Sequence, residues 1–167
     1  MKLKLFKKYF FTTSVIIVIS LTFMMLILSF VLNNYIAENK YKTLTKACVE
    51  IVEHIEDYAK YNKQIDIKNF YNLIITVSDV SESDIFIADS NAKVLICSCN
   101  DYRENKSCMH SSAVISKDIV EDKSRFGDNK SAFLSTLGIY KKPHYVAVEN
   151  LMSESNQVYG TVFSTSP

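Results

Sequence analysis

Residues 15 to 32 read Val15-Ile-Ile-Val-Ile-Ser-Leu-Thr-Phe-Met-Met-Leu-Ile-Leu-Ser-Phe-Val-Leu32, and this run decides how the chain is organised. No charged residue occurs between Lys8 and Glu38. A helix needs roughly 20 apolar residues to cross the hydrocarbon core of a bilayer. The sequence therefore predicts a membrane-spanning helix over residues 9–32, preceded by a short basic head over residues 1–8.

Two alternatives to a membrane anchor can be weighed against the same residues. A secretory signal peptide has a shorter apolar region, of about 7–15 residues, followed by small residues at the cleavage site. Here the run is longer, and it is followed by Asn33-Asn-Tyr-Ile-Ala-Glu38. A buried core helix is the other alternative, but a chain of 167 residues has little protein with which to surround it. An uncleaved anchor is favoured.

The lysines on either side of the span indicate its orientation. Four precede it within eight residues, and those that follow stand further away, beyond Glu38. Positive charge close to a span marks the cytoplasmic side of the membrane. We therefore expect a single span in the cell membrane, with the N-terminus in the cytoplasm and the C-terminal domain extracytoplasmic.

The composition limits what the remaining part can be. Beyond the span about 130 residues are left, which is enough for one domain with one core. The chain has a formal net charge of +1, so its charge gives no reason to expect a nucleic-acid partner. Only three Gly and two Pro argue against a disordered region.

Residues 33–62 are predicted to form a membrane-proximal signalling helix. Their apolar residues recur at alternating steps of four and three, a period of 3.5 sustained for about three heptads. This stripe consists of Ala37, Tyr41, Leu44, Cys48, Ile51, Ile55 and Tyr58. Two interpretations are open and compatible: the stripe pairs with a second subunit in a homodimer, or it packs on its own domain.

The rest of the chain, residues 63–167, predicts an α+β domain. It begins with a second helix whose N-cap is Asp66. The helix has an apolar stripe of Ile67, Phe70, Leu73, Ile74, Val77 and Val80. A hairpin follows, with apolar runs at 84–88 and 93–97 joined by the turn Asp89-Ser-Asn-Ala92.

The C-terminal half of this domain predicts three more strands. Residues 98–130 are polar and irregular, with one short helix expected at 117–123. The strands are expected at 131–140, 144–151 and 157–164, with a turn at 153–156 before the last. The predicted fold is therefore a five-stranded antiparallel sheet with helices on one side.

Cys97, Cys99, Cys108 and His110 form the one dense group of ligand-type side chains in the sequence. Cys97 and Cys99 would lie on the same face of a strand, because side chains alternate. Outside the cell, a disulfide from Cys97 or Cys99 to Cys108 would stabilise the fold by roughly 3 kcal/mol. Alternatively, three sulfurs and one nitrogen suit Zn²⁺. Unpaired thiols are the third interpretation, and the sequence leaves all three open.

Other polar residues carry less information. His144 and Tyr145 begin a strand and are possible ligand-facing residues. Glu149 interrupts an apolar strand, so it either faces solvent or is a buried carboxylate with a partner. His54 is interpreted as a solvated helix residue. No arrangement of nucleophile and base, Gly-rich phosphate loop or paired carboxylates occurs, so we expect no catalytic residue and no cofactor.

Several segments resemble a known family. Thr136-Leu-Gly-Ile-Tyr-Lys-Lys-Pro-His-Tyr-Val-Ala-Val148 and Gln157-Val-Tyr-Gly-Thr-Val-Phe163 resemble the end of extracytoplasmic sensor domains in bacterial sensor histidine kinases. Asp84-Ile-Phe-Ile-Ala-Asp89 and Ala92-Lys-Val-Leu-Ile96 resemble their first hairpin, and Cys108-Met-His110 is similar to a piece of such domains. The resemblance implies a PAS-like, or Cache-like, fold and a role in a two-component signal transduction system.

The resemblance also implies parts that this sequence does not contain. A second span, a HAMP linker and a cytoplasmic kinase would follow, whereas the sequence ends at Ser164-Thr-Ser-Pro167, and it has no phospho-accepting or ATP-binding segment. The expected function is thus sensing of an unknown extracellular cue, with any kinase activity in the parent protein. The alternatives are a non-signalling membrane-tethered envelope protein and the ligand-binding end of a chemoreceptor.

Overall fold

The computed structural model describes residues 2–60, 66–99, 110, 113–116, 119, 132–153 and 157–167, with side chains from residue 7 onward. The described residues form two compact units, Met1–Glu38 and Asn39–Pro167. The long helix α1 (Lys2–Lys60) contributes residues to both.

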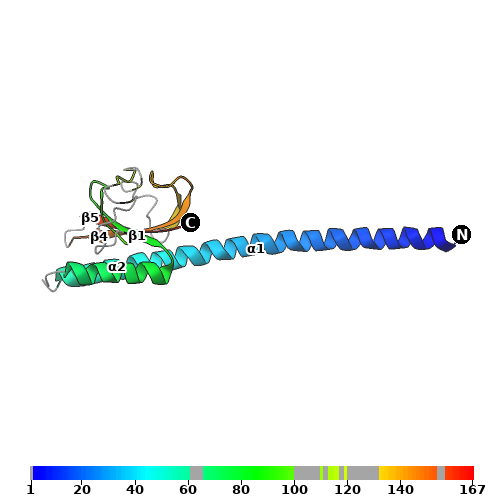
Figure 1. The fold of residues 1–167 in the computed structure, drawn as a ribbon, viewed down its shortest axis with the longest axis horizontal. Coiled ribbons are helices and arrows are strands. Elements are labelled where there is room, and N and C mark those ends of the chain that lie inside the picture. The colour runs from blue at the N-terminus through cyan, green and yellow to red at the C-terminus, as the bar shows by residue number, and fades with distance from the viewer. Residues whose placement is uncertain are drawn as a thin grey trace. The chain divides into compact units, whose positions relative to one another are not determined.

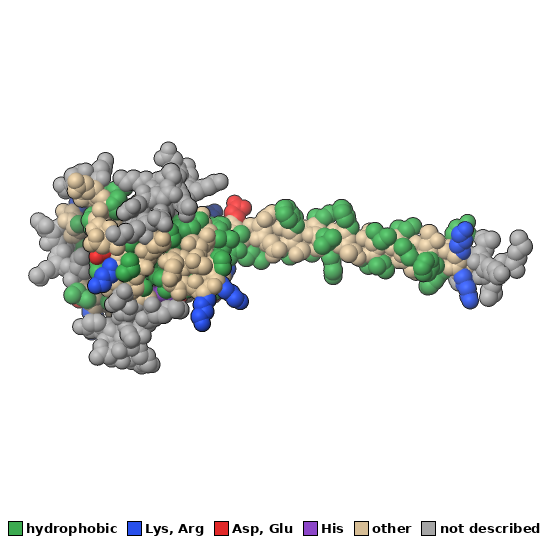
Figure 2. Space-filling view, turned by 90° about the horizontal axis from the view of Figure 1, so that it is seen from above, with side chains coloured by type: hydrophobic (Ala, Val, Ile, Leu, Met, Phe, Trp, Pro, Cys, Tyr) green, Lys and Arg blue, Asp and Glu red, His purple; other side chains and the backbone are tan. Residues whose placement is uncertain are grey.

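In the first unit, the apolar side chains face outward. One stretch of α1 is long and apolar enough to span a membrane, and none of it is buried. Figure 2 shows hydrophobic side chains along the length of this segment. Met25, near its middle, is 76% exposed. An exposed apolar surface of this length is what a helix surrounded by lipid presents, and it agrees with the span predicted for residues 9–32.

The second unit is built on a five-stranded antiparallel sheet, with strands in the order β2-β1-β5-β4-β3. The strands are β1 (Asp84–Asp89), β2 (Val94–Cys97), β3 (Ala132–Ser135), β4 (His144–Met152) and β5 (Val158–Ser166). The end of α1 and the second helix, α2 (Ile67–Ser81), lie on one side of the sheet (Figure 1). The predicted α+β fold class, with helices on one side of the sheet, is confirmed.

The helix-covered face of the sheet forms the first hydrophobic core. Ile85, Ala147 and Val162 point from the sheet into this core, against residues of both helices. Helix α1 contributes four central residues of the predicted stripe to this core. They are Leu44, Cys48, Ile51 and Ile55, and each is 9% exposed or less. This part of the stripe packs on its own domain, and pairing of the helix with a second subunit stays a prediction.

Helix α2 begins where the sequence predicts. The side chain of Asp66 accepts a hydrogen bond from the Lys68 backbone N–H at 3.0 Å, as an N-cap does. Phe70, Ile74 and Val77 are buried, but the two ends of the predicted stripe are not. Ile67 is 65% exposed and Val80 is 81% exposed, since the helix meets the core only along its central turns.

The other face of the sheet is covered by segments outside the named helices and strands. Phe86 and Phe163 lie on neighbouring strands and stack with their ring centroids 5.2 Å apart. Ile115, Ile119 and Leu137 pack over them and are almost inaccessible to solvent. Both faces of β1 are therefore buried, as its uninterrupted apolar sequence predicts.

Three predicted elements are shorter than expected or fall largely outside the described residues. The strand predicted at 131–140 ends at Ser135, because Leu137 (φ 52°) and Gly138 (φ 76°) take left-handed conformations that form a turn. Of the helix predicted at 117–123 only Ile119 is described, and of the turn at 153–156 only Ser153.

Candidate functional site

A cluster of two thiols and an imidazole lies on the face of the sheet opposite the helices. Cys97 is the last residue of β2, and Cys99 follows in a turn. Their Sγ atoms are 2.8 Å apart, and the Nδ1 atom of His110 lies 3.4 Å from Cys97 Sγ and 3.1 Å from Cys99 Sγ. The structure thus brings together three of the four residues that the sequence singled out. Cys108 lies outside the described residues.

The strand alternation used to predict this proximity is not what produces it. The strand ends at Cys97, and the Ser98 backbone N–H donates to the Ile85 carbonyl at 2.7 Å while its hydroxyl accepts from the Ile85 N–H at 2.9 Å. These two hydrogen bonds hold the turn against β1. They fix the position from which Cys99 reaches back toward Cys97.

Aromatic rings hold the imidazole of His110 in place. Phe86 stacks on it with centroids 5.5 Å apart, and Tyr140 meets it edge-on at 5.3 Å. The Tyr140 hydroxyl is 2.7 Å from Thr165 Oγ1. His110 is only 3% exposed, whereas Cys99 is exposed. The cluster therefore has a buried apolar wall and one side that is open to solvent.

The electrostatics of the cluster follow from this half-buried position. The hydrogen bond with Cys99 raises the pKa of His110, more than burial lowers it. Burial raises the pKa of the Tyr140 phenol, so this side chain stays neutral and acts as a hydrogen-bonding group. Among the described residues, the buried Nε2 atom of His110 has no hydrogen-bond partner.

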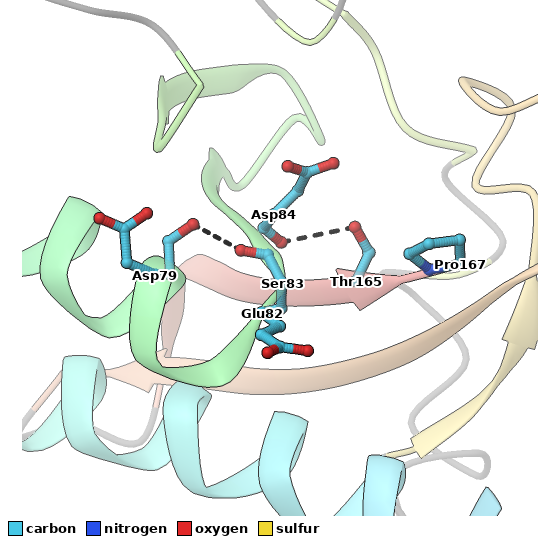
Figure 3. Close-up of a pocket in the computed structure, with 7 residues that line it drawn as sticks. Asp79, Glu82, Ser83, Asp84, Thr165 and Pro167 are labelled. Carbon is cyan, nitrogen blue, oxygen red and sulfur yellow. Dashed lines mark hydrogen bonds between the residues drawn. The ribbon is translucent and has the colours of Figure 1, made fainter.

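The second candidate feature is a hollow of about 290 Å³ where α2 meets the sheet (Figure 3). Its lining consists of Ser78, Asp79, Glu82, Ser83, Asp84, Thr165 and Pro167. Glu82 ends the helix in a left-handed conformation, and the Ser83 N–H then donates to the Ser78 carbonyl at 3.1 Å. The Ser83 hydroxyl lies 2.9 Å from that of Ser164, and this contact ties the helix end to β5.

The chemistry that this hollow offers is that of hydrogen-bond acceptors. Three carboxylates line it, and the Thr165 hydroxyl donates toward the Asp84 carbonyl at 3.4 Å. Groups of this kind attract cations and hydroxyl-rich molecules. The sequence analysis missed this feature, because its lining comes from a helix end and two strands that are far apart in the chain.

His144 and Tyr145, the predicted ligand-facing residues, lie on opposite faces of β4. His144 stacks on Tyr140 at 4.0 Å between ring centroids, on the side of the thiol–imidazole cluster. Tyr145 contacts Tyr41 of α1 edge-on at 5.2 Å, on the helix side. They cannot line a single surface, and a ligand contact by either one stays a prediction.

Tyr140 and Thr165 are functional candidates that the sequence analysis did not identify. Tyr140 touches both His110 and His144, and its hydroxyl is bonded to Thr165. The only sequence signal was that Tyr140 belongs to a segment that resembles sensor domains. Its role depends on the turn at Leu137 and Gly138, which carries the chain back over the sheet.

Comparisons with known proteins add similar solved structures. No protein-family model matches the chain, and no curated protein matches it either. Among solved structures it is similar to the ligand-binding domain of the Campylobacter jejuni chemoreceptor Tlp3, which was crystallised with 4-methylisoleucine. The identity is 13%, the TM-score is 0.39, and the match covers 78% of this chain and 60% of that one.

Proposed function

We propose that this chain is the membrane-anchoring and extracytoplasmic sensory portion of a bacterial receptor. One observation carries the proposal: an uncharged, unburied apolar helix segment belongs to the same chain as an α+β domain with its own buried core. The core helix of a soluble domain would be buried, whereas a receptor needs an exposed apolar segment as an anchor. The lysines at positions 2, 4, 7 and 8 support a cytoplasmic N-terminus and an exported body.

The kind of receptor that we propose first is a sensor histidine kinase of a two-component system. Its support is the resemblance of the two C-terminal strands and the first hairpin to such sensor domains. A chemoreceptor is the alternative, and the same α+β domain would serve either one. In both cases, a cue acts across the membrane only if it binds two arrangements of the protein with different affinities.

We also propose that the receptor is a homodimer, but not through the stripe that periodicity first suggested. Leu44, Ile51 and Ile55 are used inside the domain. The exposed face of α1 in this region carries Lys42, Lys46, Val49, Glu53, Glu56 and Lys60. Subunit contacts along this face would be mainly polar, with oppositely charged side chains available at neighbouring heptad positions.

The test is a pair of reporter fusions after Pro167 of the full chain in bacterial cells. Alkaline phosphatase is active only after export, and green fluorescent protein is fluorescent only in the cytosol. We expect an active phosphatase, a dark fluorescent protein, and a chain that sediments with membranes. A control variant, Leu21→Arg with Leu26→Arg, places two charges in the span at roughly 2.5–3.5 kcal/mol each and should reduce both export and sedimentation.

Three results would contradict the proposal. A fluorescent, cytosolic fusion would remove the receptor interpretation altogether. An exported chain that is released into the medium would show that the segment is cleaved, and would leave a secreted domain in place of an anchored sensor. An anchored chain with no effect on any signalling output would favour the non-signalling envelope protein.

A further inference from the structure

The thiol–imidazole cluster has the donor set of a metal site. The ligand atoms of Cys97, Cys99 and His110 all lie within 4.8 Å of one another. Two sulfurs and one imidazole nitrogen are soft or borderline donors, which select Zn²⁺ and Cu⁺ over Mg²⁺ and Ca²⁺. We propose that these three residues form a Zn²⁺ site on the face of the sheet opposite the helices.

The distances fit such a site after a small opening. A Zn²⁺ ion with Zn–S bonds of about 2.3 Å and a Zn–N bond of about 2.0 Å spreads tetrahedral donors to about 3.6–3.8 Å from one another. The observed separations are 2.8, 3.1 and 3.4 Å. The donors therefore need to move apart by about 1 Å or less to reach this geometry. Cys99 can make this movement, because it is exposed and lies in a turn rather than in the strand.

The orientation of His110 is a second, independent observation. Its Nδ1 atom is aimed at both sulfurs, and its buried Nε2 atom has no hydrogen-bond partner among the described residues. The two thiols are thus the polar partners that this buried ring faces in the described part of the chain. Coordination through Nδ1 would supply a strong interaction for the ring, with its proton on Nε2. Phe86 and Tyr140 already hold the ring plane.

The number of donors among the described residues bears on what the site can do. Structural Zn²⁺ sites have four protein ligands, whereas three leave a position for water or another ligand. Cys99 lies on the exposed side of the cluster, so the ion would be reachable from solvent. The site goes beyond the proposed sensory function and does not depend on it, because the donors belong to one face of the sheet whatever the topology of the membrane helix.

The test uses the full chain, purified in detergent under reducing conditions and stripped of metal with a chelator. The probe is Co²⁺, which reports tetrahedral thiolate coordination by its visible and charge-transfer absorption. We expect one equivalent to bind, and one equivalent of Zn²⁺ to displace it. X-ray absorption of the zinc-loaded wild-type chain should show at least two sulfurs and at least one nitrogen around the ion. A shell made only of oxygen and nitrogen would overturn the proposal.

Variants then assign the site to these residues. Cys97→Ser, Cys99→Ser and His110→Gln should each weaken Zn²⁺ binding by more than about 100-fold, because removing a ligand costs more than removing an outer partner. Cys48→Ala and His54→Ala are matched thiol and imidazole controls, since Cys48 is buried under the helix-covered face and His54 is exposed on α1. Both should bind Zn²⁺ as the wild type does. Circular dichroism should confirm that each variant is folded. If Cys97→Ser unfolds, the Zn²⁺ affinity of Cys99→Ser tests the thiol ligands, because Cys99 is at an exposed position.

Several results would reject the site. The absence of a Co²⁺ spectrum in the folded, reduced chain is one of them. Tight Zn²⁺ binding that survives all three substitutions, or that is lost equally in Cys48→Ala, is another. Thiol titration of the isolated, unreduced chain that finds Cys97 or Cys99 locked in a disulfide would establish the competing interpretation. None of these results bears on export, which the reporter fusions measure separately.

Discussion

Glu149 shows how one charged residue in an apolar strand can affect stability. It lies in the middle of β4 and is half-buried, and its pKa is raised first by burial and then by the carboxylate of Glu56 on α1. Burial is the main cause that raises the pKa of Cys48 and that of Tyr159, and the charges of Glu149 and Glu56, respectively, raise them further. The sequence left Glu149 as either solvent-facing or buried with a partner, and the structure places it between these states.

The prediction for Glu149 concerns pH. A carboxyl group whose pKa is higher in the folded state favours folding when protonated. Its stabilising effect is therefore lost as pH rises from the ordinary value of about 4.3 through the raised one. Glu149→Gln should stabilise the domain at neutral pH by about 0.5 kcal/mol, a small value because water screens a half-exposed pair. The difference from wild type should disappear near pH 4 in thermal unfolding followed by circular dichroism.

A matched substitution distinguishes the buried carboxylate from a general effect of charge. Glu53 is exposed on α1, so Glu53→Gln should change stability little at any pH. If Glu149→Gln destabilises the domain at neutral pH, the carboxylate makes a favourable contact there. The predicted direction of the stability change is then wrong.

At the same scale, the sequence predicted that Cys97, Cys99 and His110 form a group better than it predicted how they meet. The spacing of Cys97 and Cys99 indicated a pair, but the reason given, strand alternation, does not apply after the strand ends. The approach of His110 to these sulfurs depends on the path of the chain after Cys99, and local periodicity contains no information on that path. Tyr140 was missed for the same reason.

At the scale of elements, the end of α2 offers a test of backbone strain. Glu82 takes φ 49° and ψ 47°, a left-handed conformation that costs a residue with a Cβ atom roughly 1–2 kcal/mol. Glycine adopts this conformation without that cost and is the usual residue at helix C-caps. Glu82→Gly should therefore be more stable than Glu82→Ala by about 1 kcal/mol, in chemical or thermal unfolding.

Comparing these two variants with each other removes the effect of charge, because both lack the carboxylate. Equal stabilities would mean that the left-handed conformation is not strained here. A less stable Glu82→Gly would mean that the entropy of glycine in the unfolded chain outweighs the relief of strain.

The same scale shows where periodicity is informative and where it is not. It predicted the stripe on α1 and the helical conformation, but a 3.5-residue repeat does not say what covers the stripe. The buried residues Leu44, Ile51 and Ile55 show that the sheet of the same domain covers it. The strand that was predicted too long, at 131–140, still has the apolar residues Ile139 and Tyr140 at its end. Only Gly138 marked the turn, and Leu137 beside it adopts a positive φ that its residue type does not predict.

At the scale of the whole molecule, the distribution of buried residues predicts where the chain can be cut. Every buried core residue in the described part of the chain lies at or after Leu44. A shortened version should include Lys40, because its amino group donates to the Ser166 hydroxyl at 3.1 Å and to the Pro167 carbonyl at 2.6 Å. A version consisting of residues 39–167 thus retains the complete core and loses the exposed apolar segment.

We expect this shortened protein to remain in solution without detergent and to unfold in one cooperative transition, as small domains with an intact core do. A version that begins at Glu50 is the matched control, because it also lacks the apolar segment but has lost Leu44, Ala47 and Cys48 from the core. Losing buried side chains of this kind costs about 2–5 kcal/mol for a single leucine, so the shorter version should melt at a much lower temperature or fail to fold. The measurements are sedimentation in buffer and thermal unfolding of both versions. The contradicting result is that residues 39–167 aggregate without a cooperative transition, while the full chain in detergent shows one. The exported domain would then depend on the segment before it. The division into an anchor and an independently folded sensor would be wrong.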